Sequence, residues 1–261
     1  MTNLTPLRNF LSDPSNDLGD NAWKLVDLVK TMNNKRFIDL GVRNGASSAV
    51  LSVDADKNSN KVSGCDLDFA GFFRNGSRFV QGDYTCYQYD SVTLGKNWDE
   101  DPLDIVFVDT LHTREFVLAE LYYWMHNINE GGYFVFHDTH MVNRGDYVIG
   151  GVAWSTPDEA VADLFGLPDD MRNGPLHEAI TISEYEDDDI ELKHYPDSYG
   201  MTFVKVKSLD AIERFKSRID WKDVFEKRNF LIDLYFNPEK PFGKELGLDL
   251  SKITYELNLN P

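Results

Sequence analysis

Short apolar segments alternate with helical patterns through the first half of the chain, and this alternation constrains the fold more than any other feature of the sequence. Strands that alternate with helices are joined by right-handed crossovers, which produces a parallel sheet covered on both faces. The pattern therefore predicts a doubly wound α/β domain. The expected strands are RFIDL (36–40), KVSGCDLD (61–68), SRFVQGD (77–83), LDIVFVD (103–109) and YFVFHD (133–138).

Helical patterns fill the connections between these segments. Apolar residues recur at helical spacing from Trp23 to Met32, and ASSAVLSV (46–53) continues the first strand as a helix. The segment 113–132 predicts an amphipathic helix that stops at Gly131. A further helix is expected over 155–167, where a cap and an early proline precede the apolar pattern.

The second half of the chain adds a hairpin and a helical extension. DIELKHY (189–195) and GMTFVKVK (200–207) predict two strands joined by a turn, with an antiparallel strand at the edge of the sheet. With the hairpin, a mostly parallel sheet of seven strands is expected. Residues 208–261 contain two more helical patterns and no second core, so we expect one domain over 1–207 and a helical extension packed on it over 208–261.

Charge and composition exclude several classes of function. The 261-residue chain has a formal net charge of −18, which repels phosphate backbones and anionic lipid surfaces, so neither nucleic acid nor membrane is an expected partner. No apolar run approaches the ~18 residues of a membrane span, and the polar first residues do not resemble a signal peptide. A cytoplasmic protein is therefore expected. Two cysteines are too few for a disulfide framework.

Acidic residues lie at the ends of the first five predicted strands. Ligands of an open parallel sheet bind beyond the carboxyl ends of the strands, where the strand order reverses. One acid at a strand end is an ordinary turn former, but five strands that end in this way indicate a functional rim. The acids in question are Asp39, Asp66 with Asp68, Asp83, Asp109 and Asp138.

The turn after the first strand is a second indication of a ligand. Gly41 and Gly45 lie between the strand and the following helix, whose first turn carries Ser47 and Ser48. A dinucleotide site has three glycines around its pyrophosphate, whereas this turn has the pattern GxxxG. Asp66 suits the paired hydroxyls of a ribose because a carboxylate accepts both hydrogen bonds. The sequence thus favours a nucleoside without a pyrophosphate.

These segments, FIDLGVRNGASS, VSGCDLD, FVQGD and LDIVFVDTLHT…GGYFVFHDTH, resemble the successive motifs of class I S-adenosylmethionine-dependent methyltransferases, whose fold is Rossmann-like. The Asp-x-x-His after the fourth strand is similar to small-molecule O-methyltransferases and cephalosporin hydroxylase-type proteins. The resemblance implies a cofactor site in which Ser47 also participates, O-methylation of a sugar or natural-product scaffold, and a homo-oligomer by analogy. It implies that Asp39, Gly41 and Gly45 flank the methionine part of the cofactor, Asp66 or Asp68 holds the ribose, and Asp83 meets the adenine amine.

The last two strand ends carry the candidate chemistry. Asp109 and Asp138 should end neighbouring strands, so their carboxylates can converge on a divalent cation, magnesium or calcium for an all-oxygen set. Thr139 or His140 is a candidate third ligand. His112 follows Asp109 by three residues and is either the general base or a capping residue. His137 lies inside the strand and is interpreted as a core histidine.

Three other functions stay open at this point. His112, His137, His140 and the acids could form an iron site of an oxygenase, although His137 and His140 cannot both face one site from an extended strand. A non-catalytic descendant could bind the cofactor or a partner through the C-terminal extension. A nicotinamide dehydrogenase shares the architecture, but its turn carries a different glycine pattern.

Overall fold

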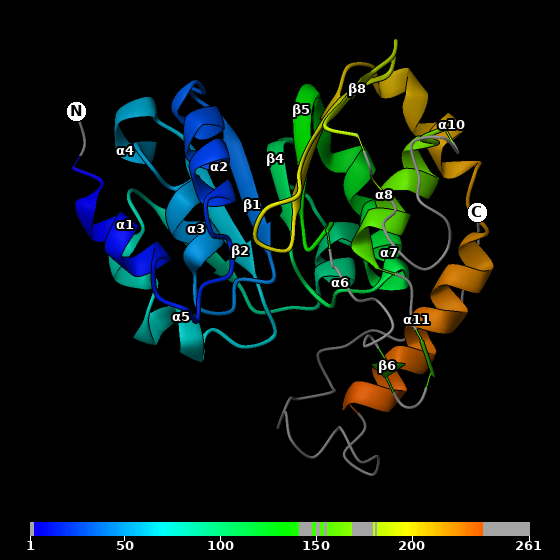
Figure 1. Ribbon diagram of the computed structural model, residues 1–261, viewed down its shortest axis with the longest axis horizontal. Helices are drawn as coiled ribbons and strands as arrows, with labels where there is room; N and C mark the ends of the chain where they lie inside the picture. The colour runs from blue at the N-terminus through cyan, green and yellow to red at the C-terminus, as the bar shows by residue number, and fades with distance from the viewer. Residues whose placement is uncertain are drawn as a thin grey trace.

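The computed structural model describes residues 3–140, 148–149, 152–153, 156–168, 180 and 182–236. Its centre is an eight-stranded sheet in the order β3-β2-β1-β4-β5-β10-β9-β8, with helices on both faces (Figure 1). The strand order reverses between β1 and β4, because the chain moves outward from β1 to β3 and then crosses to the other side. The predicted α/β class with a mostly parallel sheet is confirmed.

The sheet has a parallel half and an antiparallel half. β1 to β5 pair in parallel, and β10, β9 and β8 add three antiparallel strands, one more than the predicted hairpin contains. A separate pair, β6 (Val148–Ile149) and β7 (Val152–Ala153), lies outside the sheet. The sheet strands are β1 (Arg36–Leu40), β2 (Lys61–Cys65), β3 (Tyr84–Tyr87), β4 (Leu103–Val108), β5 (Ile128–His137), β8 (Glu184–Glu186), β9 (Ile190–Tyr195) and β10 (Met201–Val206).

The helices occupy the predicted connections, but one of them ends earlier than expected. The helix expected over 113–132 ends at Trp124, and a 3-10 turn (Met125–Asn127) leads directly into β5, so that Gly131 lies within a strand. The α-helices of the described residues are α1 (Thr5–Leu11), α2 (Asn21–Lys30), α3 (Ala46–Leu51), α4 (Ala55–Asn58), α5 (Ala70–Arg74), α6 (Ser91–Lys96), α7 (Arg114–Trp124), α8 (Pro157–Phe165), α10 (Ile212–Lys216) and α11 (Trp221–Phe236).

The third strand differs from the sequence expectation. Residues Ser77–Phe79 form a 3-10 turn, and β3 begins only at Tyr84. The expected strand over 77–83 is therefore wrong. The YTCY segment pairs with β2 instead, where Tyr84 lies against the backbone of Gly64 and hydrogen bonds with Ser48 (2.6 Å). Asp83 consequently precedes a strand.

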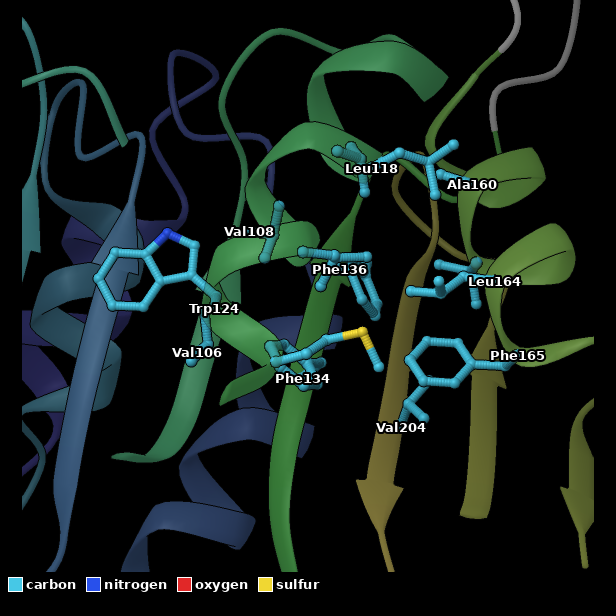
Figure 2. Close-up of a cluster of buried hydrophobic side chains, with 14 of the residues drawn as sticks. Val106, Val108, Leu118, Trp124, Phe134, Phe136, Ala160, Leu164, Phe165 and Val204 are labelled. Carbon is cyan, nitrogen blue, oxygen red and sulfur yellow. The ribbon is translucent and has the colours of Figure 1, made fainter. Parts of the chain in front are cut away.

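Alternate residues of the strands supply two hydrophobic cores, as expected for a sheet covered on both faces. One core joins Phe37, Ile105 and Phe107 to α1, α2 and α3. The other joins the opposite face of the strands to α7 and α8, and Figure 2 shows Val106, Phe134 and Phe136 facing Leu118, Leu164 and Phe165. The second core is the larger and supports the ends of β4 and β5.

The C-terminal extension begins against this second core. In α11, Phe225 packs edge-on against Tyr122 of α7 with ring centroids 5.5 Å apart. Residues 237–261 lie outside the described residues, so the division into a domain over 1–207 and an extension over 208–261 stays a prediction. Within the described part of the chain, none of the helices has both the length and the apolar character that crossing a membrane requires.

Candidate active site

The carboxyl ends of β2, β1 and β4 surround a cavity of about 470 Å³ at the point where the strand order reverses. This is where an open α/β sheet binds its ligand, and the volume lies within the ~300–1,000 Å³ range of small-molecule sites. The cavity is lined by Gly41, Arg43, Cys65, Asp66, Leu67, Tyr89, Asp90, Ser91, Asp109, Thr110, Leu111, His112, Phe116 and Ile232.

The two glycines of the first turn have different surroundings. At Gly41 (φ 92°) an added Cβ would lie 2.0 Å from the carbonyl oxygen of Asp109, so a side chain there would separate β1 from the end of β4. Gly41 also lines the cavity. At Gly45 (φ 84°) the added Cβ would meet the Phe72 ring at 2.6 Å. Gly45 therefore serves packing and the left-handed start of α3, and it does not line the cavity.

Asp39 lies beneath this turn and is fully buried. Its Oδ2 accepts hydrogen bonds from Ser47 (2.7 Å) and from Ser48. Burial raises the pKa of Asp39 to about 7, although the hydrogen bonds from the Ser48 and Ser47 hydroxyls lower it. Asp39 and Ser47 thus hold the start of α3 to the end of β1, and Asp39 does not line the cavity where the resemblance expected it.

Asp66 and Asp68 also differ from each other. Asp66 lines the cavity, and its carboxylate accepts hydrogen bonds from the backbone N–H groups of Arg43 (2.8 Å) and Asp68 (3.0 Å). Burial raises the pKa of Asp66. Asp68 is exposed, and its side chain accepts from the Ala70 N–H at the start of α5. The geometry therefore favours Asp66 over Asp68 as the ribose ligand.

Asp83 is displaced from the rim because β3 starts after it. The residue is exposed and lies at the opposite end of β3 from the cavity. The acid that follows β3 is Asp90, which lines the cavity together with Tyr89 and Ser91. The adenine role expected for Asp83 thus has no geometric support. The signal for Asp90 was present in the YDS sequence, which caps a short helix, but the misplaced strand concealed it.

Four side chains gather at the ends of β4 and β5. His112 Nε2 lies 3.2 Å from Asp109 Oδ1 and 3.0 Å from Asp138 Oδ2. His137 Nδ1 lies 3.5 Å from Asp109 Oδ1 and 3.3 Å from Asp138 Oδ2. Each of the two carboxylate oxygens thus faces both imidazoles. The predicted convergence of Asp109 and Asp138 agrees with this geometry.

The electrostatics of this cluster follow from close opposite charges. Burial lowers the pKa of His112, but the hydrogen bonds and negative charges of Asp109 and Asp138 outweigh this effect and raise the pKa to about 10. Burial also opposes the shift at Asp109, whose pKa is nevertheless held well below its usual value by His137 and His112. The carboxylates of Asp109 and Asp138 thus favour the protonated forms of His112 and His137.

His137 takes the place that the sequence assigned to His140. Consecutive residues of an extended strand point to opposite faces, so His137 and Asp138 would not be expected to share a site. Asp138 has a φ of 55°, in the left-handed region, and this breaks the alternation at the end of β5. His140 instead lies against His194 with ring centroids 5.7 Å apart, and Thr139 accepts a hydrogen bond from Thr202 (2.8 Å). Neither residue reaches the cluster.

The cluster has unmet bonding capacity that suits a cation. Asp138 Oδ2 and both ring nitrogens of His137 are buried and have no hydrogen-bond partner with proper geometry among the described residues. Ligand atoms of Asp109, His137 and Asp138 all lie within 4.8 Å of one another. One imidazole and two carboxylates form a mixed nitrogen and oxygen set, in which His137 lies where Thr139 or His140 was expected.

Comparisons with known proteins agree with the fold. Residues 38–139 match the family model of a methyltransferase domain. A search of the curated proteins found no match to this sequence.

Solved structures with the same fold include three from different organisms. A protein from Klebsiella pneumoniae has a TM-score of 0.53 and 15% identity, with 80% of this chain and 92% of that chain covered. The SAH-bound methyltransferase PaMTH1 from Podospora anserina has a TM-score of 0.54 and 13% identity, with 78% and 88% covered. The O-methyltransferase TomG from Streptomyces achromogenes, involved in tomaymycin synthesis and solved with SAM, has a TM-score of 0.50 and 14% identity, with 78% and 89% covered.

Proposed function

Because residues 38–139 carry a methyltransferase domain within the fold of the class I superfamily, we propose that the protein is an S-adenosylmethionine-dependent O-methyltransferase that acts on a small-molecule hydroxyl. The observation that carries the proposal is the cavity itself. It extends from the end of β3 past β2 and β1 to β4, and it ends beside His112 and Asp109. A long nucleoside and a proton-accepting group would therefore meet at one rim.

The residues around the cavity divide according to the parts of the cofactor. In this proposal Asp66 accepts the ribose hydroxyls, and the Asp90 and Ser91 segment meets the adenine ring. Gly41 and the neighbouring turn face the methionine part, next to Asp109. When bound, the cofactor supplies a methyl group activated on a sulfonium. Asp39, Ser47 and Gly45 support this site from beneath the cavity.

His112 is the group placed to accept the proton of the acceptor. Attack of the acceptor oxygen on the methyl carbon would break the carbon–sulfur bond, whose electron pair would stay on sulfur, and S-adenosylhomocysteine would be released. His112 would accept the acceptor's proton on Nδ1, because its Nε2 faces the carboxylates of Asp109 and Asp138. His112 must be neutral for this step, so another cation has to balance Asp109 and Asp138 in its place.

We further propose that Asp109, His137 and Asp138 hold a divalent cation. Their unmet bonding capacity and short mutual distances support this assignment. A cation held there would lower the pKa of an acceptor hydroxyl. Because the set includes an imidazole, it favours a first-row transition ion such as Mn²⁺ or Co²⁺ more than an all-carboxylate set would.

The proposal is tested by calorimetry of the whole chain with S-adenosylhomocysteine and with NAD, each with and without Mn²⁺ or Mg²⁺. Saturable binding of S-adenosylhomocysteine and no binding of NAD is the expected result. Methyl transfer from labelled S-adenosylmethionine to a panel of sugars and phenolic scaffolds then tests the acceptor class. A preference for NAD would overturn the proposal. Transfer of the labelled methyl group to amines and not to hydroxyls would overturn O-methylation.

A second candidate is favoured by one observation. His112, His137 and Asp109 supply two imidazoles and a carboxylate, the donor set of non-haem iron oxygenases. The sequence alternative with His137 and His140 is not supported, because His140 faces His194. Oxygen consumption by the Fe²⁺-loaded protein in the absence of S-adenosylmethionine would favour this candidate, and methyl transfer by the Mg²⁺- or Mn²⁺-loaded protein under anaerobic conditions would favour the first.

A further inference from the structure

The C-terminal helix reaches the cavity. Ile232 of α11 lines it, together with Phe116 of α7. Arg228 precedes Ile232 by four residues and therefore lies on the same face of the helix, one turn away. Figure 1 shows α11, in orange, beside α7. A segment far beyond the methyltransferase motifs in sequence thus forms part of the wall of the site.

Arg228 is a fully buried cation, and Asp90 is its one ion-pair partner among the described residues. Its side chain is 0% exposed, and Nη2 donates to Asp90 Oδ1 at 2.7 Å. The guanidinium lies 5.2 Å from the centre of the Phe116 ring. Its Nε and Nη1 atoms are buried with no hydrogen-bond partner among the described residues. A buried charge in this state is costly unless its pairing has a structural or functional use.

Asp90 is held from two sides by these contacts. Its Oδ2 accepts from the N–H (3.1 Å) and the hydroxyl (3.0 Å) of Thr93 and so caps α6, while its Oδ1 faces Arg228. Asp90 and Phe116 both line the cavity, so both partners of Arg228 are wall residues. The start of α6 and Arg228 of α11 therefore fix the orientation of the Asp90 carboxylate, at the end of the cavity that lies next to β3.

We propose that α11 is a component of the cofactor site and that Arg228 is a positioning residue, which holds Asp90 and Phe116 against the adenosine half of the ligand. The inference rests on the proposed function, because it takes the cavity to hold a nucleoside. Free energies of linked binding are reciprocal. Docking of α11 strengthens nucleoside binding, and nucleoside binding stabilises the docked helix.

The test compares two neighbouring substitutions on α11. Arg228→Met removes the charge and keeps most of the side-chain length, whereas Lys227→Met changes the adjacent residue, which is 48% exposed and paired with Asp223. Calorimetry should show that Arg228→Met lowers the affinity for S-adenosylhomocysteine by about tenfold or more, because removing one partner of a buried ion pair costs more than removing a surface partner. The affinity for adenosine should fall by the same factor, because both ligands contain the adenosine half. Lys227→Met should bind both ligands like the wild type, and Arg228→Lys should recover part of the loss.

A second measurement separates positioning from general stability. In the wild-type protein, S-adenosylhomocysteine should slow amide hydrogen exchange in the peptide that covers 221–236, as reciprocity requires. A folded Arg228→Met protein with wild-type affinity would overturn the inference. Where that variant does not fold, Ile232→Ala takes its place, and wild-type affinity in Ile232→Ala would overturn it equally. A wild-type protein that binds neither ligand contradicts the proposed function itself.

Discussion

Asp39 near the end of β1 and Asp109 just after β4 lie on adjacent strands, with Asp39 opposite Phe107 and Asp109 two residues further along, and their surroundings differ completely. Asp39 is enclosed, and two serine hydroxyls satisfy one of its oxygens. Asp109 borders a cavity and faces two histidines. The same residue type near the ends of two adjacent strands thus supports the fold in one case and borders the cavity in the other. The groups that face a strand end decide its role.

The comparison is tested most strongly by removing the proton acceptor at β4. His112→Ala should lower the turnover of methyl transfer by about 10²–10⁴-fold, the usual contribution of a positioned acid or base. The affinity of this variant for S-adenosylhomocysteine should stay unchanged, because the substitution removes the proton acceptor and leaves the nucleoside contacts intact. His126→Ala, at a half-exposed surface histidine, is the matched control. Normal turnover in His112→Ala would remove it from the mechanism.

The structural carboxylate should instead control the pH dependence of stability. Burial raises the pKa of Asp39 from 3.8 to about 7 in the folded state. Between about pH 4 and pH 7, Asp39 is ionised in the unfolded chain and protonated in the folded protein. The contribution of Asp39 to the free energy of unfolding is therefore complete below about pH 4 and decreases as the pH rises towards 7. Relative to Asp39→Asn, the wild-type free energy of unfolding should decrease by up to about 4 kcal/mol across this window.

Chemical denaturation of both proteins at several pH values measures this difference. Asp68→Asn serves as the control, because Asp68 is exposed and should give a curve parallel to that of the wild type. A wild-type curve parallel to that of Asp39→Asn would show that Asp39 ionises equally in both states and would contradict the structural role.

The choice between His137 and His140 sharpens the comparison at the metal cluster. His137→Glu replaces the imidazole with a carboxylate and should reduce the preference for Co²⁺ over Mg²⁺ by about tenfold or more, since imidazole nitrogen suits the transition ion better. His140→Ala should leave both affinities unchanged, because His140 packs against His194. Titration calorimetry and the visible absorption of bound Co²⁺ measure the effect. The opposite result would restore the sequence-based ligand set of Asp109, Asp138 and His140.

Much of this architecture could be predicted from the sequence, because apolar periodicity and strand-ending acids report on local structure. The mostly parallel sheet and the meeting of Asp109 with Asp138 both follow from it. Two errors have a common cause. The register of β3 depends on the packing of Tyr84 against Gly64. The presence of His137 in the cluster with Asp109 and Asp138 depends on the left-handed backbone at Asp138. Neither a tertiary contact nor a backbone reversal has a local sequence signal.

Arg228 illustrates a further limit of sequence reasoning. Its helix was predicted correctly, but an arginine on an amphipathic helix ordinarily faces water. Only the tertiary structure shows that its partner is Asp90, 138 positions earlier in the chain. The contribution of the extension to the cavity could not be inferred from spacing or composition.

The smallest expected effects concern the acids that the fold leaves outside the cavity. Asp68→Asn and Asp83→Asn should each change the affinity for S-adenosylhomocysteine by less than about threefold, since exposed substitutions away from special contacts usually change free energies by under ~0.5 kcal/mol. Asp66→Asn should lower it by about tenfold or more, because it weakens charged hydrogen bonds to the ribose. Calorimetry on the three variants ranks them directly. A strong loss in Asp83→Asn alone would mean that the segment before β3 reaches the nucleoside, and the strand register described above would then be wrong.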